Sequence, residues 1–162
     1  MILYHGSNVS IDKIDLSKSK TGKDFGCGFY LSADESQALR MAEKKTAIAG
    51  YGVPTVNKYE FDTMVLNSNE LNVQKFDSYN REWAEFILMN RKNRDKSLCH
   101  PYDIVIGPIA DDTVGFQIRR YIEGIITIEQ FIDELRYMHG VTMQYFFGTP
   151  KAIDYLTKIE AI

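Results

Sequence analysis

The chain has 162 residues, of which 44% are hydrophobic and 25% are charged, and its formal net charge is −3. This length fits one domain with its own core, and the composition is that of a globular protein. The slight acidic excess gives no strong attraction to nucleic acid or an anionic membrane, although an RNA target stays open. The start of the chain has no basic leader, and no segment has the roughly 18 apolar residues needed to cross a bilayer. We therefore predict a single cytoplasmic domain, residues 1–162, without a membrane partner.

The cysteines and histidines exclude further classes of protein. Cys27 and Cys99 stand alone without the spacing of metal ligands, and the three histidines are scattered along the chain. Neither a disulfide scaffold nor a structural zinc site can be built from these residues. We therefore predict a protein that uses no metal.

The first third of the chain has signals for two strands and a helix. Residues 2–4 and 29–31 are predicted as short strands, separated by a polar loop over residues 6–24 and a glycine bend just before the second strand. Ser32 followed by Glu35 has the pattern of a capping box, which predicts a helix start. We expect this helix to run to Ala49, where glycines end it.

The rest of the chain mixes strands and helices without a regular alternation. Residues 55–76 alternate as a strand, and a helix follows on which Trp83 faces the core. The expected later elements are a buried strand at 103–107, helices near 113–123 and 128–138, a strand from Val141 to Phe147 and a last helix beginning at Thr149–Pro150. A capping box at Thr127–Gln130 marks the second of these helices. This order predicts an α+β fold.

Three short segments contain the residues of chemical interest: Tyr4–Ser7, Gly28–Ser32 and Gln144–Ile153. Taken singly, each has an ordinary structural interpretation. His5 would be a hydrogen-bonded residue at a strand end, Tyr30 a strand aromatic, and Gln144 a polar residue facing solvent.

Together, in this order, the segments resemble the three-part NAD signature of ADP-ribosyltransferases. The resemblance is to the histidine–tyrosine subclass shared with diphtheria-type toxins and poly-ADP-ribose polymerases, with Gln at the usual Glu position. It is closer still to a bacterial family catalogued as a domain of unknown function within that superfamily. The phrases that carry it stand at Leu3–Ser7, Asp24–Leu31, Trp83–Arg91, Tyr102–Asp112 and Gln144–Ala152, and they cover nearly the whole chain. The resemblance implies a split β-sandwich flanked by helices.

The resemblance also implies roles for individual residues, with NAD as co-substrate. His5 would bind a ribose hydroxyl, the backbone of Gly6 would pair with the nicotinamide carboxamide, and Tyr30 would stack on the nicotinamide ring. Gln144 would grip the nicotinamide ribose. The implied catalytic residues are therefore His5, Tyr30 and Gln144, and the implied NAD-binding residues are His5, Gly6, Ser7, Tyr30, Ser32, Arg91 and Asp112. For Ser32, a capping role is the more natural interpretation.

Gln144 has the hydrogen-bonding capacity of the usual Glu but not its negative charge, because its side chain is a neutral amide. The negative charge of the site would therefore have to come from another residue. Asp111 and Asp112 are the acidic pair that we expect to compensate, and helix capping is their structural alternative. Arg91 begins a short basic run that would either bind a phosphate or lie at a solvated helix end.

The function implied by the resemblance is ADP-ribosyl transfer to a macromolecule, as the toxin of a toxin–antitoxin or phage-defence system with a small antitoxin protein as partner. Two alternatives stay open: an NAD glycohydrolase, and a non-catalytic module that binds NAD, nucleic acid or a partner protein.

Two sequence features argue against other classes of NAD-dependent enzyme. Gly26-x-Gly28 lacks the strand–turn–helix context of a Rossmann fingerprint, so we do not expect a Rossmann oxidoreductase. Thr142, two residues before Gln144, argues against the arginine-modifying type, and residues 137–143 are expected to select the target.

Overall fold

The computed structural model describes residues 1–135 and 141–162, and these residues form a mixed α+β fold on a seven-stranded sheet. The strands are β1 (Ile2–Ser7), β2 (Phe29–Ser32), β3 (Thr55–Phe61), β4 (Val73–Lys75), β5 (Ile104–Pro108), β6 (Met143–Phe147) and β7 (Leu156–Ala161). The helices are α1 (Glu35–Ala49), α2 (Arg81–Lys92), α3 (Asp112–Ile122), α4 (Ile128–Leu135) and α5 (Pro150–Ile153), with 3₁₀ turns η1 (Leu16–Lys18) and η2 (Thr63–Asn67). The predicted α+β class is confirmed.

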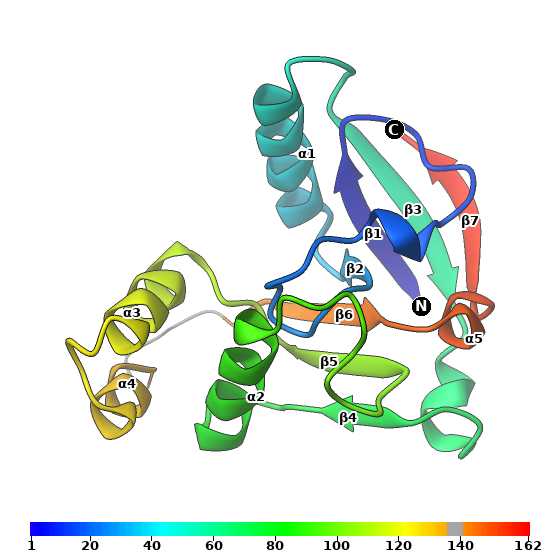
Figure 1. Cartoon of the computed structure of the whole chain (residues 1–162). Helices are drawn as coiled ribbons and strands as arrows, with labels where there is room; N and C mark the ends of the chain where they lie inside the picture. The colour runs from blue at the N-terminus through cyan, green and yellow to red at the C-terminus, as the bar shows by residue number, and fades with distance from the viewer. Residues whose placement is uncertain (136–140) are drawn as a thin grey trace.

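The sheet has the strand order β4-β5-β6-β2-β1-β3-β7 and is nearly divided in its middle. β1 pairs with β3 along its whole length, but it pairs with β2 only where Tyr4 lies opposite Ser32. In Figure 1, β4, β5 and β6 run across the lower half of the view, whereas β1, β3 and β7 run steeply through the upper right. The two parts of the sheet therefore diverge at the junction between β1 and β2.

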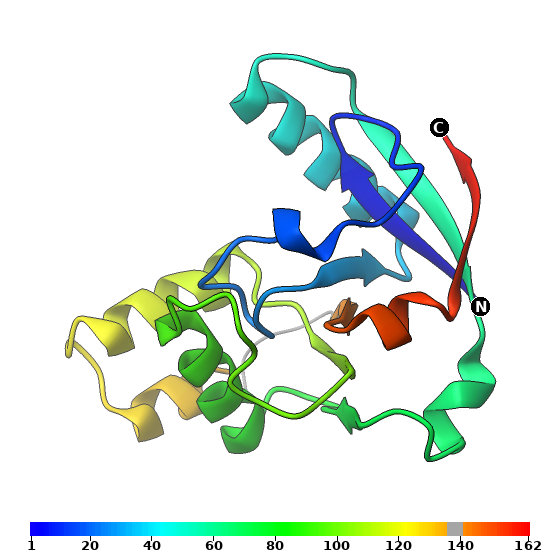
Figure 2. The same cartoon turned by 45° about the vertical axis from the view of Figure 1, so that its right-hand side comes forward.

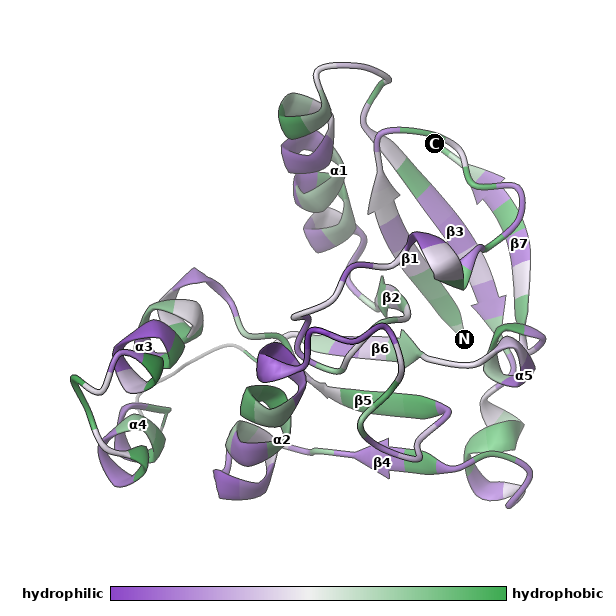
Figure 3. Cartoon of the chain, viewed as in Figure 1, coloured by the Kyte–Doolittle hydropathy of each residue, from purple (hydrophilic) through white to green (hydrophobic). Residues whose placement is uncertain are grey.

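Two apolar clusters hold the sheet from opposite sides. The fully buried Phe146 of β6 joins the cluster under α2, α3 and α4, which includes Trp83 and Phe131. Its neighbour Phe147 joins the other cluster, with Leu3 of β1 and others. Figure 3 shows β5, between β4 and β6, as hydrophobic. Each such aromatic side chain stabilises the fold by about 1.5–3 kcal/mol relative to an exposed one.

The start of α1 differs from the sequence prediction. Asp34 caps the helix by accepting hydrogen bonds from the backbone of Ser36 and Gln37, so the predicted capping box of Ser32 and Glu35 is wrong. Ser32 is instead the last residue of β2 and is buried. The predicted end at Ala49 is confirmed, with Gly50 in the left-handed conformation after it.

Other helix and strand boundaries differ from the predicted ones because turns divide segments that the sequence pattern presents as continuous. The strand predicted over residues 55–76 ends at Phe61, and η2 separates it from the short β4. The last helix begins at Pro150 as predicted but ends at Ile153, and the strand β7 that follows was not predicted. The capping box at Thr127 and Gln130 is confirmed by its two reciprocal hydrogen bonds. The end predicted for α4 lies outside the described residues.

Helix α1 lies directly against β1 at Gly6. A Cβ atom on Gly6 would lie 2.0 Å from the carbonyl oxygen of Ala38 and 2.7 Å from the amide nitrogen of Ala42. Both of these are backbone atoms, which cannot move aside without shifting the helix. The small residues Ala38 and Ala42, one turn apart on α1, allow this close approach.

We therefore expect Gly6→Ala to lower the free energy of unfolding by at least about 3 kcal/mol, because α1 must move away from β1. The matched control is Gly115→Ala in α3, where the nearest atom to a new Cβ is the Arg119 side chain at 3.8 Å. Removing a helical glycine there is expected to add up to about 1 kcal/mol. Urea unfolding of both variants measures the difference, and equal stabilities would contradict the packing argument.

Candidate functional site

The three predicted catalytic residues lie on strands next to the divergence of β1 from β2. His5 and Gly6 lie on β1 beyond the single pair with β2, and Tyr30 lies on β2. Gln144 on β6 lies opposite Ser32 of β2. The structure thus brings the three predicted catalytic residues onto adjacent strands.

His5 has a defined protonation state. Its Nδ1 lies 2.6 Å from the Tyr30 carbonyl oxygen, which only accepts, so Nδ1 carries the proton. Its Nε2 therefore accepts a hydrogen bond from Lys45 Nζ at 3.2 Å, and its ring stacks on Phe29. Burial, together with the neighbouring charge of Lys45, lowers the pKa of His5 to about 3. At neutral pH His5 is an uncharged residue that can serve in binding but not as a general acid.

Lys45 is a site residue that the sequence analysis missed. From α1 it also donates a hydrogen bond of 2.6 Å to the carbonyl oxygen of Gly6. Burial, together with the positive charges of Lys23 and Lys20, lowers the pKa of Lys45 to about 8. Ala38, Ala42 and Lys45 follow the spacing of one helical face. That spacing is the signal that places this lysine over β1.

Gly6 has a structural reason for lacking a side chain, which changes the interpretation of this residue. The sequence analysis assigned the Gly6 backbone to the nicotinamide carboxamide; in the structure the backbone of α1 fills the space that a Cβ of this residue would take. The next residue, Ser7, is buried at the end of β1, where it lies opposite Thr55.

Tyr30 joins β2 to the loop of residues 19–28. Its hydroxyl donates to the carbonyl oxygen of Gly26 at 2.7 Å and accepts from the amide of Phe25 at 3.0 Å. The ring lies near the rings of Phe25 and Phe146. Burial raises the pKa of Tyr30 well above its usual range, so the hydroxyl stays protonated. A planar ligand stacked on the Phe25 side of Tyr30 would have to displace that side chain.

The loop of residues 19–28 is closed by Ser19, whose Oγ accepts from the amide of Gly28 and donates to its carbonyl oxygen. Gly26 turns the loop with a φ of +93°, a conformation that L side chains rarely adopt. The ring of His100 holds the carbonyl oxygen of Phe25 at 2.8 Å. Figures 1 and 2 both place this loop beside the end of α2.

The loop carries Asp24, a second residue that the sequence analysis did not select as a site residue. Its Oδ1 accepts from Arg91 Nε at 2.6 Å, and its Oδ2 lies 3.4 Å from Gln144 Nε2. The Gln144 amide also approaches the carbonyl oxygen of Pro108 at 3.5 Å. Arg91 is thus turned inward onto a carboxylate. Asp24 belongs to one of the sequence phrases that carry the family resemblance, but its place beside Gln144 depends on how the loop folds.

Asp111 and Asp112, the acidic pair expected near the site, lie at the start of α3. Asp111 caps α3 by accepting from the amide of Val114 at 2.9 Å, so its structural alternative is confirmed. Asp112 is exposed in the first turn of α3. Among the described residues, neither aspartate is hydrogen-bonded to His5, Tyr30 or Gln144.

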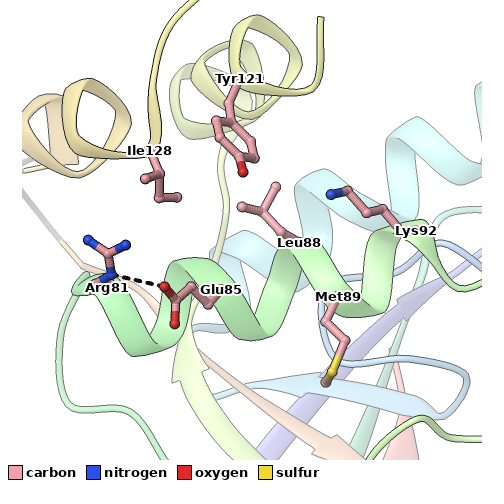
Figure 4. A pocket seen from close by; sticks show the side chains of 7 residues that line it. All are labelled: Arg81, Glu85, Leu88, Met89, Lys92, Tyr121 and Ile128. Atoms are coloured by element: carbon pink, nitrogen blue, oxygen red, sulfur yellow. Dashed lines mark hydrogen bonds and ion pairs between the residues drawn. The ribbon is translucent and has the colours of Figure 1, made fainter. Parts of the chain in front are cut away.

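A separate hollow of about 320 Å³ lies between α2, α3 and α4. Figure 4 shows that Tyr121 and Ile128 face α2, where Arg81 and Glu85 form an ion pair of 2.9 Å. The full lining is Arg81, Glu85, Leu88, Met89, Lys92, Tyr121 and Ile128. It contains none of the residues predicted for NAD.

The described ranges hold neither a metal-binding cluster nor a membrane-spanning helix. Residues 1–135 and 141–162 contain no group of three His, Cys, Asp or Glu side chains that could hold a metal ion. Among the helices of those ranges, none is long and apolar enough to cross a membrane.

The arrangement defines a polar site at the division of an α+β sheet. The family described as "Protein of unknown function (DUF3990)" matches residues 1–157, and the chain belongs to this family. Comparison with curated proteins found no match, and comparison with solved structures found none either.

The low pKa of His5 makes a prediction for acid stability. Between about pH 6.5 and pH 5 the unfolded chain protonates His5, whereas the folded chain keeps it neutral, so the unfolded state binds more protons. Stability is therefore lost as pH falls, with a slope that approaches about 1.4 kcal/mol per pH unit. Urea unfolding from pH 7 to pH 5 should show a steeper loss in the wild type than in His5→Asn. Equal slopes would contradict the assigned state of His5.

Proposed function

We propose that this protein is an ADP-ribosyltransferase that binds NAD where β1 diverges from β2. The observation that supports this most is that His5, Tyr30 and Gln144, far apart in the sequence, lie on the three neighbouring strands β1, β2 and β6. His5 Nδ1 contacts the Tyr30 carbonyl oxygen at 2.6 Å, and Gln144 lies opposite Ser32 on the strand next to Tyr30. The seven-stranded sheet, nearly divided beside these residues, supports the finer proposal of an ADP-ribosyltransferase-like split β-sandwich.

The proposed reaction breaks the bond between the ribose C1 and the nicotinamide nitrogen. The bonding electron pair leaves with nicotinamide, and positive charge develops on the ribose carbon and ring oxygen. A nucleophile of the acceptor then donates an electron pair to C1 and releases its proton to solvent. Gln144 orients the ribose through a hydroxyl, and the neutral His5 binds a hydroxyl through Nε2 once Lys45 moves aside. Binding that is stronger in this charged state than in the ground state is what accelerates the step.

The acceptor in this proposal is a macromolecule, and a protein partner that neutralises the activity fits a toxin or phage-defence role. A second candidate is a non-catalytic NAD-binding module. Two contacts occupy the positions expected for the nicotinamide, which argues against its cleavage: Lys45 binds the carbonyl oxygen of Gly6, and Phe25 lies beside the Tyr30 ring. The neutral charge of Gln144 points the same way.

The decisive experiment incubates the protein with NAD labelled in its adenylate half and a bacterial lysate. We expect nicotinamide release and label fixed to protein or nucleic acid. In Gln144→Ala both should fall at least about 100-fold, the usual cost of removing one group that binds a transition state. The matched control is Gln74→Ala on β4, outside the site, which should keep full activity. Tyr30→Ala is less informative, because it also frees the backbone of Phe25 and Gly26.

The outcomes separate the candidates. Nicotinamide release without fixed label identifies a glycohydrolase. Binding of NAD without any nicotinamide release identifies a binding module, and it would show that the proposed transferase activity is wrong.

A further inference from the structure

The site carries a carboxylate next to Gln144 that comes from a different part of the chain. In the proposed reaction, positive charge develops on the ribose, and an amide cannot compensate it. Asp24 stands beside this amide, at 3.4 Å from its Nε2. The loop that holds Asp24 is fixed by Tyr30, His100 and Ser19, so the carboxylate does not depend on a flexible segment for its place.

We propose that Asp24 is a positioning residue for Gln144 and the source of negative charge in the site, an inference that rests on the proposed function. The amide and the carboxylate act as one unit: Gln144 provides the hydrogen-bond acceptor and Asp24 provides the charge. The ligand part that this unit fits is a ribose that becomes cationic, with a hydroxyl directed at Gln144.

The hydrogen bonds around Gln144 fix the orientation of its amide. Asp24 Oδ2 and the Pro108 carbonyl oxygen are both acceptors, so the NH₂ group of Gln144 must face them. The other end of the amide, Oε1, then points away from both. Among the described residues none donates a hydrogen bond to Oε1. This oxygen is therefore the atom that accepts a hydrogen bond from a ribose hydroxyl.

Arg91 explains why the carboxylate keeps this geometry. Its Nε holds Asp24 Oδ1 at 2.6 Å, which leaves Oδ2 directed at Gln144. Arg91 lies in the last turn of α2, and the Asp24 side chain is only 13% exposed, so water screens this pair little. If Asp24 served only to form an ion pair, a contact with Arg91 would be enough. Its carboxylate contacts both Arg91 and the side-chain amide of Gln144, the predicted catalytic residue.

The test moves the carboxylate from one position to the other. Asp24→Asn keeps the shape and an acceptor for Arg91, but it sets a donor against the NH₂ group of Gln144 and removes the charge. We expect kcat for nicotinamide release to fall at least 30-fold with KM changed less than threefold, because the lost interaction acts mainly in the transition state. The double variant Asp24→Asn/Gln144→Glu, which puts one carboxylate back, should recover at least tenfold of that loss. Asp77→Asn, an exposed aspartate paired with Lys75, is the control for net charge and should leave kcat unchanged.

The results overturn or support the inference as follows. An unchanged kcat in Asp24→Asn, or a loss in a folded variant that the double variant does not recover, would overturn it, since a structural role predicts no recovery. If the wild type itself releases no nicotinamide, the proposed function fails. The inference is then decided by side-chain amide NMR of Gln144. Gln144 amide protons that shift between the wild type and Asp24→Asn, but not between the wild type and Asp77→Asn, support the coupling, and protons that keep their positions in Asp24→Asn overturn it.

Discussion

The contact of α1 with β1 at Gly6 is the constraint on which the rest of the site depends. Because the helix backbone occupies the space of a Cβ there, α1 is held at a fixed distance from β1. The same helix face delivers Lys45 to the Gly6 carbonyl oxygen and to His5. His5 in turn contacts the backbone of Tyr30 across the divergence of the two strands. A tight packing contact therefore sets the geometry of a polar cluster, and a change at Gly6 would be felt at His5 and Tyr30 without touching either.

The division of the sheet separates a group of lysines from the ion pair of Asp24 and Arg91. On the side of β1, Lys45 has no carboxylate partner among the described residues, and the neighbouring Lys20 and Lys23 act on it with the same sign. On the side of β6, Asp24 and Gln144 present oxygen atoms. Both sets are connected through the loop of residues 19–28, which carries Lys20 and Lys23 as well as Asp24. One short loop, held against β2 by the hydroxyl of Tyr30, therefore carries both these lysines and this aspartate.

The sequence predicted the class of the fold and the strands that carry the site because those signals are local. The alternation of β3, the capping residues of α4 and the stop at Gly50 depend on near neighbours, and all were confirmed. The contacts made by Lys45 and Asp24 depend on segments far apart in the chain; helical spacing puts Lys45 on the same face of α1 as Ala38 and Ala42, but no local pattern indicates its partners or those of Asp24. The cap at Asp34 shows a related limit: Ser32 and Asp34 both suit a helix start, and only the burial of Ser32 in β2 decides between them. The strand β7 is half polar and, within residues 1–135 and 141–162, pairs with β3 alone at the edge of the sheet, which leaves it a weak sequence signal.

Dividing the two tasks of a glutamate between an amide and a separate carboxylate has a chemical consequence. Asp24 contacts Gln144 through one oxygen and Arg91 through the other, so in the proposed reaction neither oxygen is free to take a proton from an incoming nucleophile. His5 is neutral, and its Nε2 is engaged by Lys45, so it provides no base while that contact lasts. If the proposed transfer takes place, this site would suit an acceptor that is already nucleophilic at neutral pH, such as a carboxylate, a thiolate or a ring nitrogen of a base. An alcohol or guanidinium would need a base that these residues do not supply, in agreement with the threonine two residues before Gln144.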